Sequence, residues 1–508
     1  MDNSNKINTI LFKISTIVFV FIYLYIFISG LFLKDGVLYK FNPVITVICV
    51  VVYTFLSIII FNKLLLKIKK DKSYNTYSII IICTMICLQL IAAYFLRVNP
   101  SWDMGAVISL STDIQINGSS ADFTYTDAHP NNLPIAVLFA IIFKVSSYLK
   151  LGISNQSIAL IFNVFMITLS IISLYLVVKK KSGNKKAFMC LLISFFTLAF
   201  YTYGPIYYTD TLTLFVPTLL LYLYFLIEDS NNKKQKNIIQ IILGIVLFIG
   251  FKLKLTSIFI FIAILLYNIF KYGFKKTAKT FIIPIVLLVI LNVIYVGILK
   301  NNNMINVNRT EIHKIPTQHW VMMGLSGNGG FNGEDCQFTD KYLNYKEKKI
   351  AINEEITKRL KAYTFISFVD HLNKKMIFTW DDGTYFSPEK LTRQIINSNE
   401  LHEYVLQSGN KNQYFNYFTQ AAHLSLMFFM CIAALALFIK KDYFNRNIII
   451  IISLLGTVMF LLIWETRSRY ILNIIPLMII LEVEGIEYIC NKINSLKEII
   501  SINMRIKK

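Results

Sequence analysis

Long runs of apolar residues, separated by short polar linkers, occupy most of the chain. Most runs are about 17–25 residues long, the length that a helix needs to cross the roughly 30 Å hydrocarbon core of a bilayer. Apolar positions are continuous and do not alternate with polar ones, which excludes the strands of a membrane β-barrel. The pattern therefore predicts an all-α polytopic membrane protein. The apolar segments cover residues 10–33, 42–66, 77–96, 133–150, 155–179, 187–203, 210–227, 237–251, 255–270, 278–299, 421–440, 447–463 and 469–490.

Composition and charge agree with this class. Hydrophobic residues make up 55% of the 508 positions and charged residues 16%, and the mean hydropathy is +0.56. So high an apolar content excludes an ordinary soluble protein. The net charge of +22 would suit nucleic acid, but the basic residues cluster in short linkers, where positive charge sets membrane orientation. We therefore expect membrane lipids as partners, and no nucleic acid.

The basic linkers predict a topology. The positive-inside rule places all of them in the cytoplasm, which requires that one apolar segment between the first two linkers does not cross. Segment 133–150 is short, follows Pro130 and carries Lys144 and Lys150, so we expect it to be an interfacial helix on the outer side. About 12 transmembrane helices then remain, with both termini cytoplasmic. The linkers are 67–72, 179–186, 233–236, 271–279 and 440–446.

This topology divides the chain into four regions. Residues 1–76 form two extra N-terminal transmembrane helices, and residues 77–299 form a membrane core whose first external loop is 97–154. Residues 300–420 are expected to be a small, mostly α extracytoplasmic domain. Residues 421–508 supply three C-terminal transmembrane helices and a cytoplasmic tail.

Two carboxylates on the predicted outer side are the candidate catalytic residues. Asp103 lies in the first external loop, which is long and acidic, and Asp210 starts a transmembrane segment. Carboxylates in this position suit the activation of an acceptor hydroxyl by proton removal. A structural alternative for Asp210 is a helix N-cap. The other acidic residues of the loop are Asp113, Asp122 and Asp127.

Basic side chains on the same side are candidates for binding a phosphate. Lys254 lies at a predicted outer hairpin, and Arg467 and Arg469 lie between the last two apolar segments. Arginine offers two-pronged contacts to phosphate oxygens and neutralises their charge. The alternatives are that Lys254 extends to the lipid headgroups and that the arginines hold lipid phosphate without catalysis.

Further polar and aromatic residues are candidates for binding the rest of a substrate. Their structural alternatives are the usual preference of Trp and Tyr for membrane interfaces, and a turn at Asp381-Asp382-Gly383. Together, carboxylates, cations and a membrane-surface location are what glycosyl transfer from a lipid-linked phosphosugar needs. These candidates are Trp102, His129, Asn131, Asn132, His319, Trp320 and Asp382.

The motifs resemble those of the GT-C superfamily of membrane glycosyltransferases, which includes protein mannosyltransferases, aminoarabinose lipid A transferases and oligosaccharyltransferases. The resemblance rests on Asp103, on the run His129-Pro130-Asn131-Asn132-Leu133-Pro134, on Tyr208-Thr209-Asp210-Thr211, on Gly250-Phe251-Lys252-Leu253-Lys254 and on Arg469-Tyr470. More narrowly, His319-Trp320-Val321-Met322-Met323-Gly324 and Thr379-Trp380-Asp381-Asp382-Gly383 are similar to a bacterial branch found in Gram-positive cell-envelope loci.

The resemblance implies a helical bundle with a groove that opens to the outer leaflet. It implies a polyprenyl-phosphate sugar as donor and a cell-envelope glycan, teichoic acid, lipid or protein as acceptor. Met104 stands where several relatives carry a second acid, and hard cations need several oxygen ligands. We therefore assign no cofactor and no metal ligand, and a divalent ion is left as an alternative.

A transporter or flippase of lipid-linked sugars is the alternative function. Such a protein should carry ionisable residues near the middle of the membrane and inverted repeats. In this sequence the notable charges lie at the ends of the apolar segments, and no repeat is evident. An envelope scaffold is a third possibility, but it leaves the Asp103 loop unexplained.

Overall fold

The computed structural model describes residues 3–64, 71–119, 124–302, 304, 307–442 and 444–506. Within these residues every regular element is a helix, and extended pairing is limited to two isolated bridges. The predicted all-α fold class is thereby confirmed. Most of the basic linker 67–72 and Asp122 lie outside the described residues.

Ten helical segments of the described chain are long and apolar enough to cross a membrane. The helix α24 (Asn447–Ile463) is apolar but shorter. The ten segments contain α1 (Asn3–Phe32), α2 (Pro43–Ile59), α4 (Asp71–Phe95), α7 (Leu133–Tyr148), α8 (Asn155–Ser182), α12 (Val216–Asp229), α13 (Lys233–Leu253), α14 (Phe259–Tyr272), α15 (Phe274–Asn301) and α23 (Asn412–Lys440).

Two further predicted spans are not single continuous α-helices. Segment 187–203 is broken at Thr197, whose backbone is extended, into α9 (Asn184–Phe196) and the short α10 (Ala199–Thr202). Segment 469–490 begins as the 3-10 helix η4 (Ser468–Ile474) and continues into α25 (Ile475–Ile506), which carries three glutamates in its first half. Neither segment is therefore among the ten, although both belong to the helical bundle.

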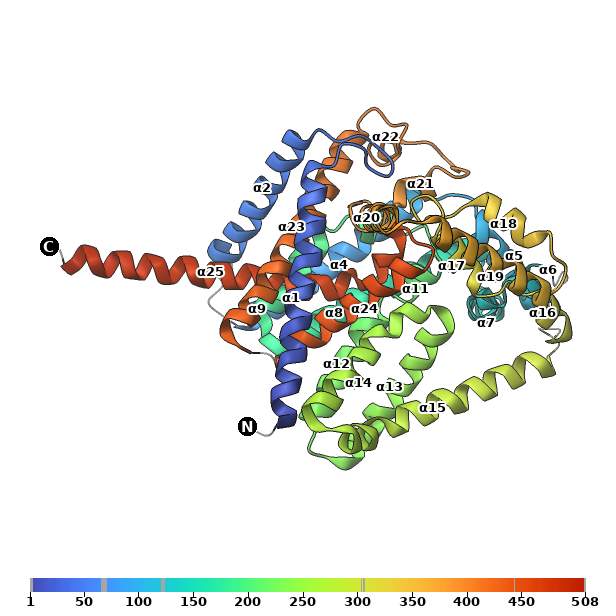
Figure 1. Ribbon diagram of the computed structural model, residues 1–508, viewed down its shortest axis with the longest axis horizontal. Coiled ribbons are helices and arrows are strands. Elements are labelled where there is room, and N and C mark those ends of the chain that lie inside the picture. Colours follow the sequence, from blue (N-terminus) through green and yellow to red (C-terminus); the bar gives the residue numbers. More distant parts are fainter. Residues whose placement is uncertain are drawn as a thin grey trace.

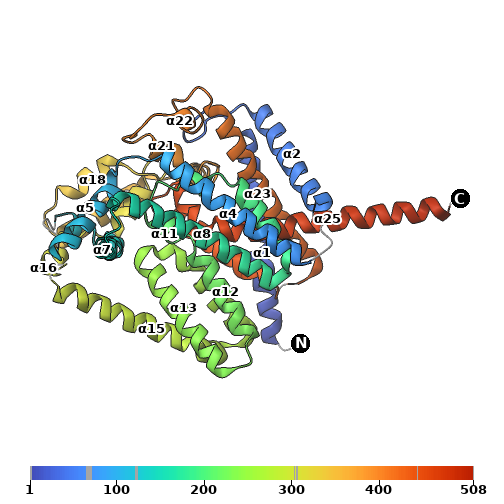
Figure 2. The same ribbon diagram turned by 180° about the vertical axis from the view of Figure 1, so that it is seen from behind.

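The helix α7 runs across the direction of the long helices. It is seen almost end-on in both Figure 1 and Figure 2, whereas α8 and α15 are seen along their length. A proline-led 3-10 turn, η2 (Pro130–Asn132), precedes α7 and sets this change of direction. By length and composition α7 could cross a membrane, but its orientation favours the predicted interfacial position.

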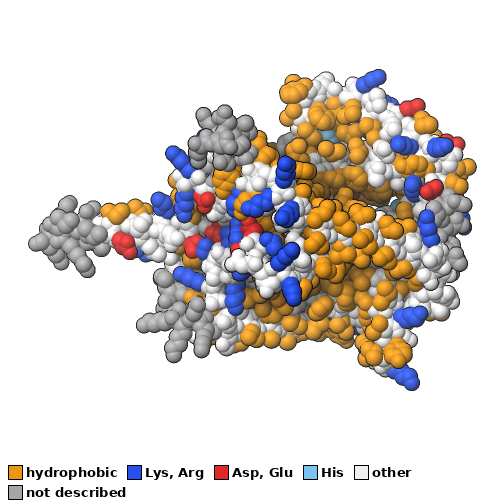
Figure 3. All heavy atoms as spheres, turned by 90° about the horizontal axis from the view of Figure 1, so that it is seen from below, with side chains coloured by type: hydrophobic (Ala, Val, Ile, Leu, Met, Phe, Trp, Pro, Cys, Tyr) orange, Lys and Arg blue, Asp and Glu red, His pale blue; other side chains and the backbone are white. Residues whose placement is uncertain are grey.

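Basic linkers from distant parts of the chain meet at one end of the bundle. Asp229, at the end of α12, pairs with Lys180 at 3.1 Å and with Arg446 at 2.8 Å. Lys181 pairs with Glu484 of α25 at 2.6 Å. Figure 3 shows Lys and Arg side chains gathered toward the end from which the C-terminal helix leaves, beside a broad apolar face. The segregation of apolar face and basic end is typical of a membrane-spanning protein.

At the opposite end of Figure 1 lies a group of short helices that cover the ends of the bundle. The segment between α15 and α23 is helical, as predicted for a mostly α external region, and α20 packs against both α1 and η4. Its helices are α16 (Val307–His313), α17 (Gln318–Gly324), α18 (Gly333–Asp340), α19 (Tyr345–Ala362), α20 (Phe365–Trp380), α21 (Ser387–Leu391) and α22 (Glu400–Val405).

Candidate active-site cavity

A cavity of about 1250 Å³ lies among these short helices. Residues from the first external loop, the start of α11 (Thr209–Leu212), the turn after α13, α17 and the segment before η4 all line it. The fold therefore brings together positions that are far apart in sequence. The predicted site residues on its wall are Trp102, Asp103, His129, Asn131, Asn132, Asp210, Lys254, His319, Trp320, Arg467 and Arg469.

Asp103 is held by a chain of hydrogen bonds. It lies in the first turn of α5 (Trp102–Asn117), and the Tyr125 hydroxyl donates to its Oδ1 at 3.0 Å. Asn132 Nδ2 donates to the Tyr125 oxygen at 2.5 Å, and the Tyr208 hydroxyl donates to Asn132 Oδ1 at 2.9 Å. The carboxylate is half-buried and keeps one oxygen free of this chain. It is thus oriented while remaining open to the cavity.

Trp102 connects Asp103 to the basic part of the wall. Its ring meets Tyr208 edge to face, with centroids 5.0 Å apart. The Arg469 guanidinium carbon lies 5.2 Å from the centroid of the same ring. Trp102 has a positive φ of 49°, a conformation that costs an L-residue roughly 1–2 kcal/mol. Such strain is often found where a site fixes a side chain, and here it fixes the indole between the carboxylate and the cations.

Asp210 is paired with two cations and does not cap a helix. The N-cap of α11 is Tyr208, so the capping alternative for Asp210 is wrong. The Lys254 ammonium donates to Asp210 Oδ1, and Arg469 Nε lies 3.5 Å from Oδ2. Asp210 is 3% exposed and Arg469 is 8% exposed. Within the described residues, Nη1 of Arg469 has no hydrogen-bond partner, so this buried guanidinium has a donor available for a ligand.

Glu465 fixes the segment that carries the arginines. Tyr470 donates to Glu465 Oε2 at 2.5 Å, and Arg467 Nε lies 3.8 Å from Oε1. Burial raises the pKa of the Glu465 carboxyl, while the Tyr470 hydrogen bond and the neighbouring arginines oppose the rise. Next to it, Trp464 stacks on Trp320 with the ring planes 3° apart and centroids 5.9 Å apart. Both indoles line the cavity.

The two predicted histidines lie on the wall near Asp103 and Asp340. Burial lowers the pKa of His319 to about 4, and its Nδ1 lies 2.7 Å from the Thr339 hydroxyl. Burial also lowers the pKa of His129, although Asp103 and Asp340 oppose the shift. Both imidazoles are therefore neutral at neutral pH. The cavity thus has a carboxylate-and-histidine side and a cationic side.

The prediction missed several residues of the wall. Tyr125, Lys390 and Arg393 line the cavity, yet no motif marked them. Tyr125 lies between the acidic residues of the first loop, which was the available sequence signal. Lys390 and Arg393 follow a turn far from the other cations in sequence, and nothing local distinguishes them from surface residues.

Asp382 is the predicted site residue that does not line the cavity. Its buried carboxylate accepts hydrogen bonds from Thr384 N at 2.9 Å, Phe386 N at 2.9 Å and the Ser468 hydroxyl at 2.6 Å. It therefore ties the turn before α21 to the serine between Arg467 and Arg469. Substrate contact was predicted for Asp382 because a turn acid and a site acid look alike in sequence.

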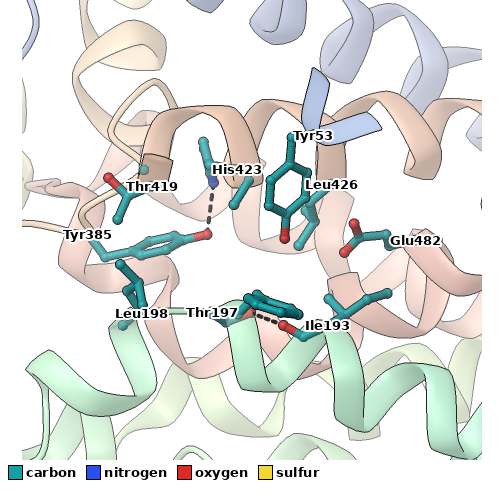
Figure 4. Close-up of a pocket in the computed structure, with 13 residues that line it drawn as sticks. Tyr53, Ile193, Thr197, Leu198, Tyr385, Thr419, His423, Leu426 and Glu482 are labelled. Atoms are coloured by element: carbon teal, nitrogen blue, oxygen red, sulfur yellow. Dashed lines mark hydrogen bonds between the residues drawn. The ribbon is translucent and has the colours of Figure 1, made fainter. Parts of the chain in front are cut away.

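A small second cavity of about 20 Å³ lies beyond this turn, inside the bundle. Figure 4 shows the Glu482 carboxyl and the hydroxyl end of Tyr53 facing it, with the Tyr385 hydroxyl hydrogen-bonded to His423 at 2.8 Å. No predicted site residue lines it. Its size suits a single water molecule.

No group of three or more His, Cys, Asp or Glu residues in the described part of the chain could hold a metal ion. The geometry instead combines an oriented carboxylate, neutral histidines and buried cations around one space. Such a set can bind an anionic group on one side and accept a proton on the other.

Comparisons with known proteins identify the family. None of the curated proteins matches the sequence. Among the solved structures that match is the archaeal oligosaccharyltransferase AglB from Archaeoglobus fulgidus, in complex with an inhibitory peptide and a dolichol-phosphate. The TM-score is 0.43 and the identity 10%; the match covers 82% of this chain and 51% of that chain, about half its length. A family model described as "Conserved hypothetical integral membrane protein" matches residues 1–488. The chain therefore belongs to this family of integral membrane proteins.

Proposed function

We propose that the protein is a membrane glycosyltransferase that moves a sugar from a polyprenyl-phosphate-linked donor to a hydroxyl of a cell-envelope acceptor. The observation that carries the proposal is the division of one cavity into two chemically different sides. Asp103 and His129 both contact Tyr125, whereas Lys254 and Arg469 both pair with Asp210. The GT-C resemblance of the motifs points to the same reaction class.

The proposed step needs one proton acceptor and one anion site. The acceptor hydroxyl oxygen attacks the anomeric carbon, the bond from that carbon to the phosphate oxygen breaks, and the hydroxyl proton passes to Asp103. The polyprenyl phosphate leaves with one more negative charge than the donor carried. Buried cations stabilise such developing charge strongly because water is excluded. Arg469, whose Nη1 has no partner among the described residues, suits this role.

We assign Asp210 a positioning role in this step. Its carboxylate is occupied by Lys254 and Arg469, so a proton from the acceptor would have to displace an ion pair. Asp103 has a neutral hydroxyl partner instead. We therefore propose Asp103 as the base, or as the group that orients the acceptor hydroxyl, and Asp210 as the anchor of the two cations.

The surroundings of the cavity suit a lipid-linked substrate. Phe251, Leu255 and Phe331 line the cavity and are 41%, 50% and 59% exposed. Exposed apolar side chains beside a cationic pocket fit a ligand with a phosphate head and a hydrocarbon tail. We place the cavity outside the cytoplasmic membrane, because the basic linkers gather at the other end of the bundle.

The test is a transfer assay with the full chain in liposomes and a panel of polyprenyl-phosphate sugars. We expect one donor to lose its sugar to an added envelope acceptor and to release polyprenyl phosphate in equal amount. Release without transfer would indicate hydrolysis. Movement of intact donor across the bilayer without cleavage would contradict the proposal and favour a flippase.

A further inference from the structure

Lys390 is a buried cation of the cavity wall that no sequence motif marked. It lies in α21, is 4% exposed, and holds its ammonium 4.2 Å from the centroid of the Trp102 ring. Its carboxylate neighbour is Glu389, whose Oε2 lies 3.6 Å away. The other oxygen of Glu389 accepts hydrogen bonds from Arg393. Lys390 therefore shares Glu389 with an arginine, and the buried carboxylate of Asp210 also lies near enough to interact with its charge.

The groups that face Lys390 are mostly cationic. Arg469 and Arg467 approach from the segment that leads into η4, and Glu389 and Arg393 belong to its own turn. Burial, reinforced by these arginines, lowers the pKa of Lys390 to about 7. An empty site therefore holds this ammonium only partly protonated at neutral pH. An anion placed among these groups would favour the charged form.

Residues with left-handed backbone conformation lie on both segments that form the Lys390–Trp102 contact. Trp102 has a φ of 49°, and Tyr385 and Phe386, just before α21, have φ values of 52° and 65°. Bulky residues rarely adopt this conformation, and where they do the surrounding structure imposes it. The Asp382 hydrogen bonds hold the second turn in place. The ammonium is thus fixed against the same Trp102 ring that Arg469 contacts.

We propose that Lys390 is a further phosphate-binding residue of the donor site and that it takes up a proton when the phosphate end of the lipid binds. The inference rests on the proposed function and deepens it. Cation–π contact with Trp102 keeps the ammonium in position while the site is empty. Because Trp102 precedes Asp103 in the chain, the same indole joins the phosphate site to the proposed base.

The test measures binding of a polyprenyl monophosphate to the purified full chain by titration calorimetry. At pH 7, two buffers with different ionisation enthalpies report the protons taken up on binding. We expect net proton uptake by the wild type, because burial lowers the pKa of Lys390 to about 7 and a bound anion favours its charged form. Lys390→Met should weaken binding about 10- to 100-fold, as expected for the loss of a charge-assisted contact.

The Lys390→Arg variant distinguishes the charge contact with the phosphate from the uptake of a proton. An arginine side chain stays charged, so this variant should bind within about tenfold of the wild type and take up no proton. Between pH 7.5 and 9 the phosphate is already fully ionised, since its second pKa is about 6. In that range wild-type affinity should fall as Lys390 loses its proton, and that of Lys390→Arg should stay flat.

The matched control is Lys252→Met, because Lys252 lines the same cavity but holds its ammonium over the Tyr295 ring. We expect it to change affinity less than about threefold. Proton uptake that persists in Lys390→Arg would assign the titration to another group of the cavity and overturn the inference. Wild-type affinity in Lys390→Met would also overturn the inference, but the proposed donor function would remain unaffected.

Two further ligands separate this failure from failure of the proposed function. Polyprenol without phosphate should bind much more weakly than polyprenyl phosphate; equal binding would contradict both proposals. Inorganic phosphate alone should bind weakly because it lacks the tail. Tight, Lys390-dependent binding of inorganic phosphate would assign the site to free phosphate and overturn the lipid-linked donor.

Discussion

At the residue scale, the two predicted carboxylates have different surroundings despite similar sequence positions. Asp103 accepts a hydrogen bond from a neutral tyrosine and is half-buried. Asp210 is buried and paired with two cations. A carboxylate paired with cations is a poor proton acceptor, because the ion pairs stabilise its charged form. The chemistry therefore belongs to Asp103 in our proposal.

We predict that Asp103→Asn lowers sugar transfer by about 10²–10⁴-fold, the usual contribution of a general base. Asparagine retains an oxygen for the Tyr125 hydroxyl, so expression and thermal stability should be close to wild type. The measurement is initial transfer rate in liposomes at saturating donor.

The control is Asp113→Asn on the same helix, because Asp113 lies outside the cavity. It should stay within roughly ±0.5 kcal/mol of wild type in stability and keep full activity. Full activity of Asp103→Asn would remove Asp103 from the mechanism. Asp210→Asn is unsuitable as a control, since it would leave Lys254 and Arg469 without their carboxylate.

At the element scale, α23 packs closely on α25, the helix that continues from η4. A Cβ on Gly485 of α25 would lie 2.0 Å from the carbonyl oxygen of Phe429 on α23. Small residues allow such close backbone approach between membrane helices. Because η4 leads directly into α25, this contact also fixes where the Arg467–Arg469 segment begins.

We predict that Gly485→Ala destabilises the protein by about 1–3 kcal/mol, the usual cost of overpacking. The clash is with backbone, which cannot move aside as a flexible side chain would. Thermal unfolding in detergent micelles measures the effect.

Gly456→Ala on α24 is the control, because nothing lies within 4 Å of its Cβ position. The control should be neutral or stabilise by up to about 1 kcal/mol, since alanine favours helix over glycine. Equal melting of both variants would contradict the packing argument.

At the scale of the whole molecule, the basic linkers and the cavity lie at opposite ends of the bundle. Ion pairs connect the α8–α9 linker, the end of α12 and the α23–α24 linker. The end that carries them should face the cytoplasm by the positive-inside rule. The cavity would then open on the outer side, as the proposed function requires.

We predict that Glu354→Cys is labelled by a membrane-impermeant thiol reagent in intact cells and that Lys275→Cys is labelled only after permeabilisation. Both positions are exposed, on α19 and at the start of α15. The variants need a background without the seven native cysteines, of which Cys83 and Cys87 are exposed. The reverse labelling pattern would place the cavity in the cytoplasm. Labelling of both in intact cells would mean that α15 does not cross.

The sequence by itself determined the helical membrane architecture. Apolar run length is a local property, and in a bilayer a continuous apolar run must satisfy its backbone hydrogen bonds as a helix. Prolines at 130 and 134 likewise marked the start of the helix that runs across the others. The sequence also marked eleven of the residues that line the cavity.

Only the tertiary structure decided the roles of individual charges. Three features depend on segments that meet only after the bundle packs. They are the pairing of Asp210 with Lys254 and Arg469, the hydrogen bond from Ser468 to Asp382 and the burial of Lys390. The break at Thr197 and the backbone approach at Gly485 also escaped the hydrophobic pattern. Hydropathy indicates whether a segment is apolar enough to lie in lipid. It carries no information on which distant side chain will contact a given carboxylate.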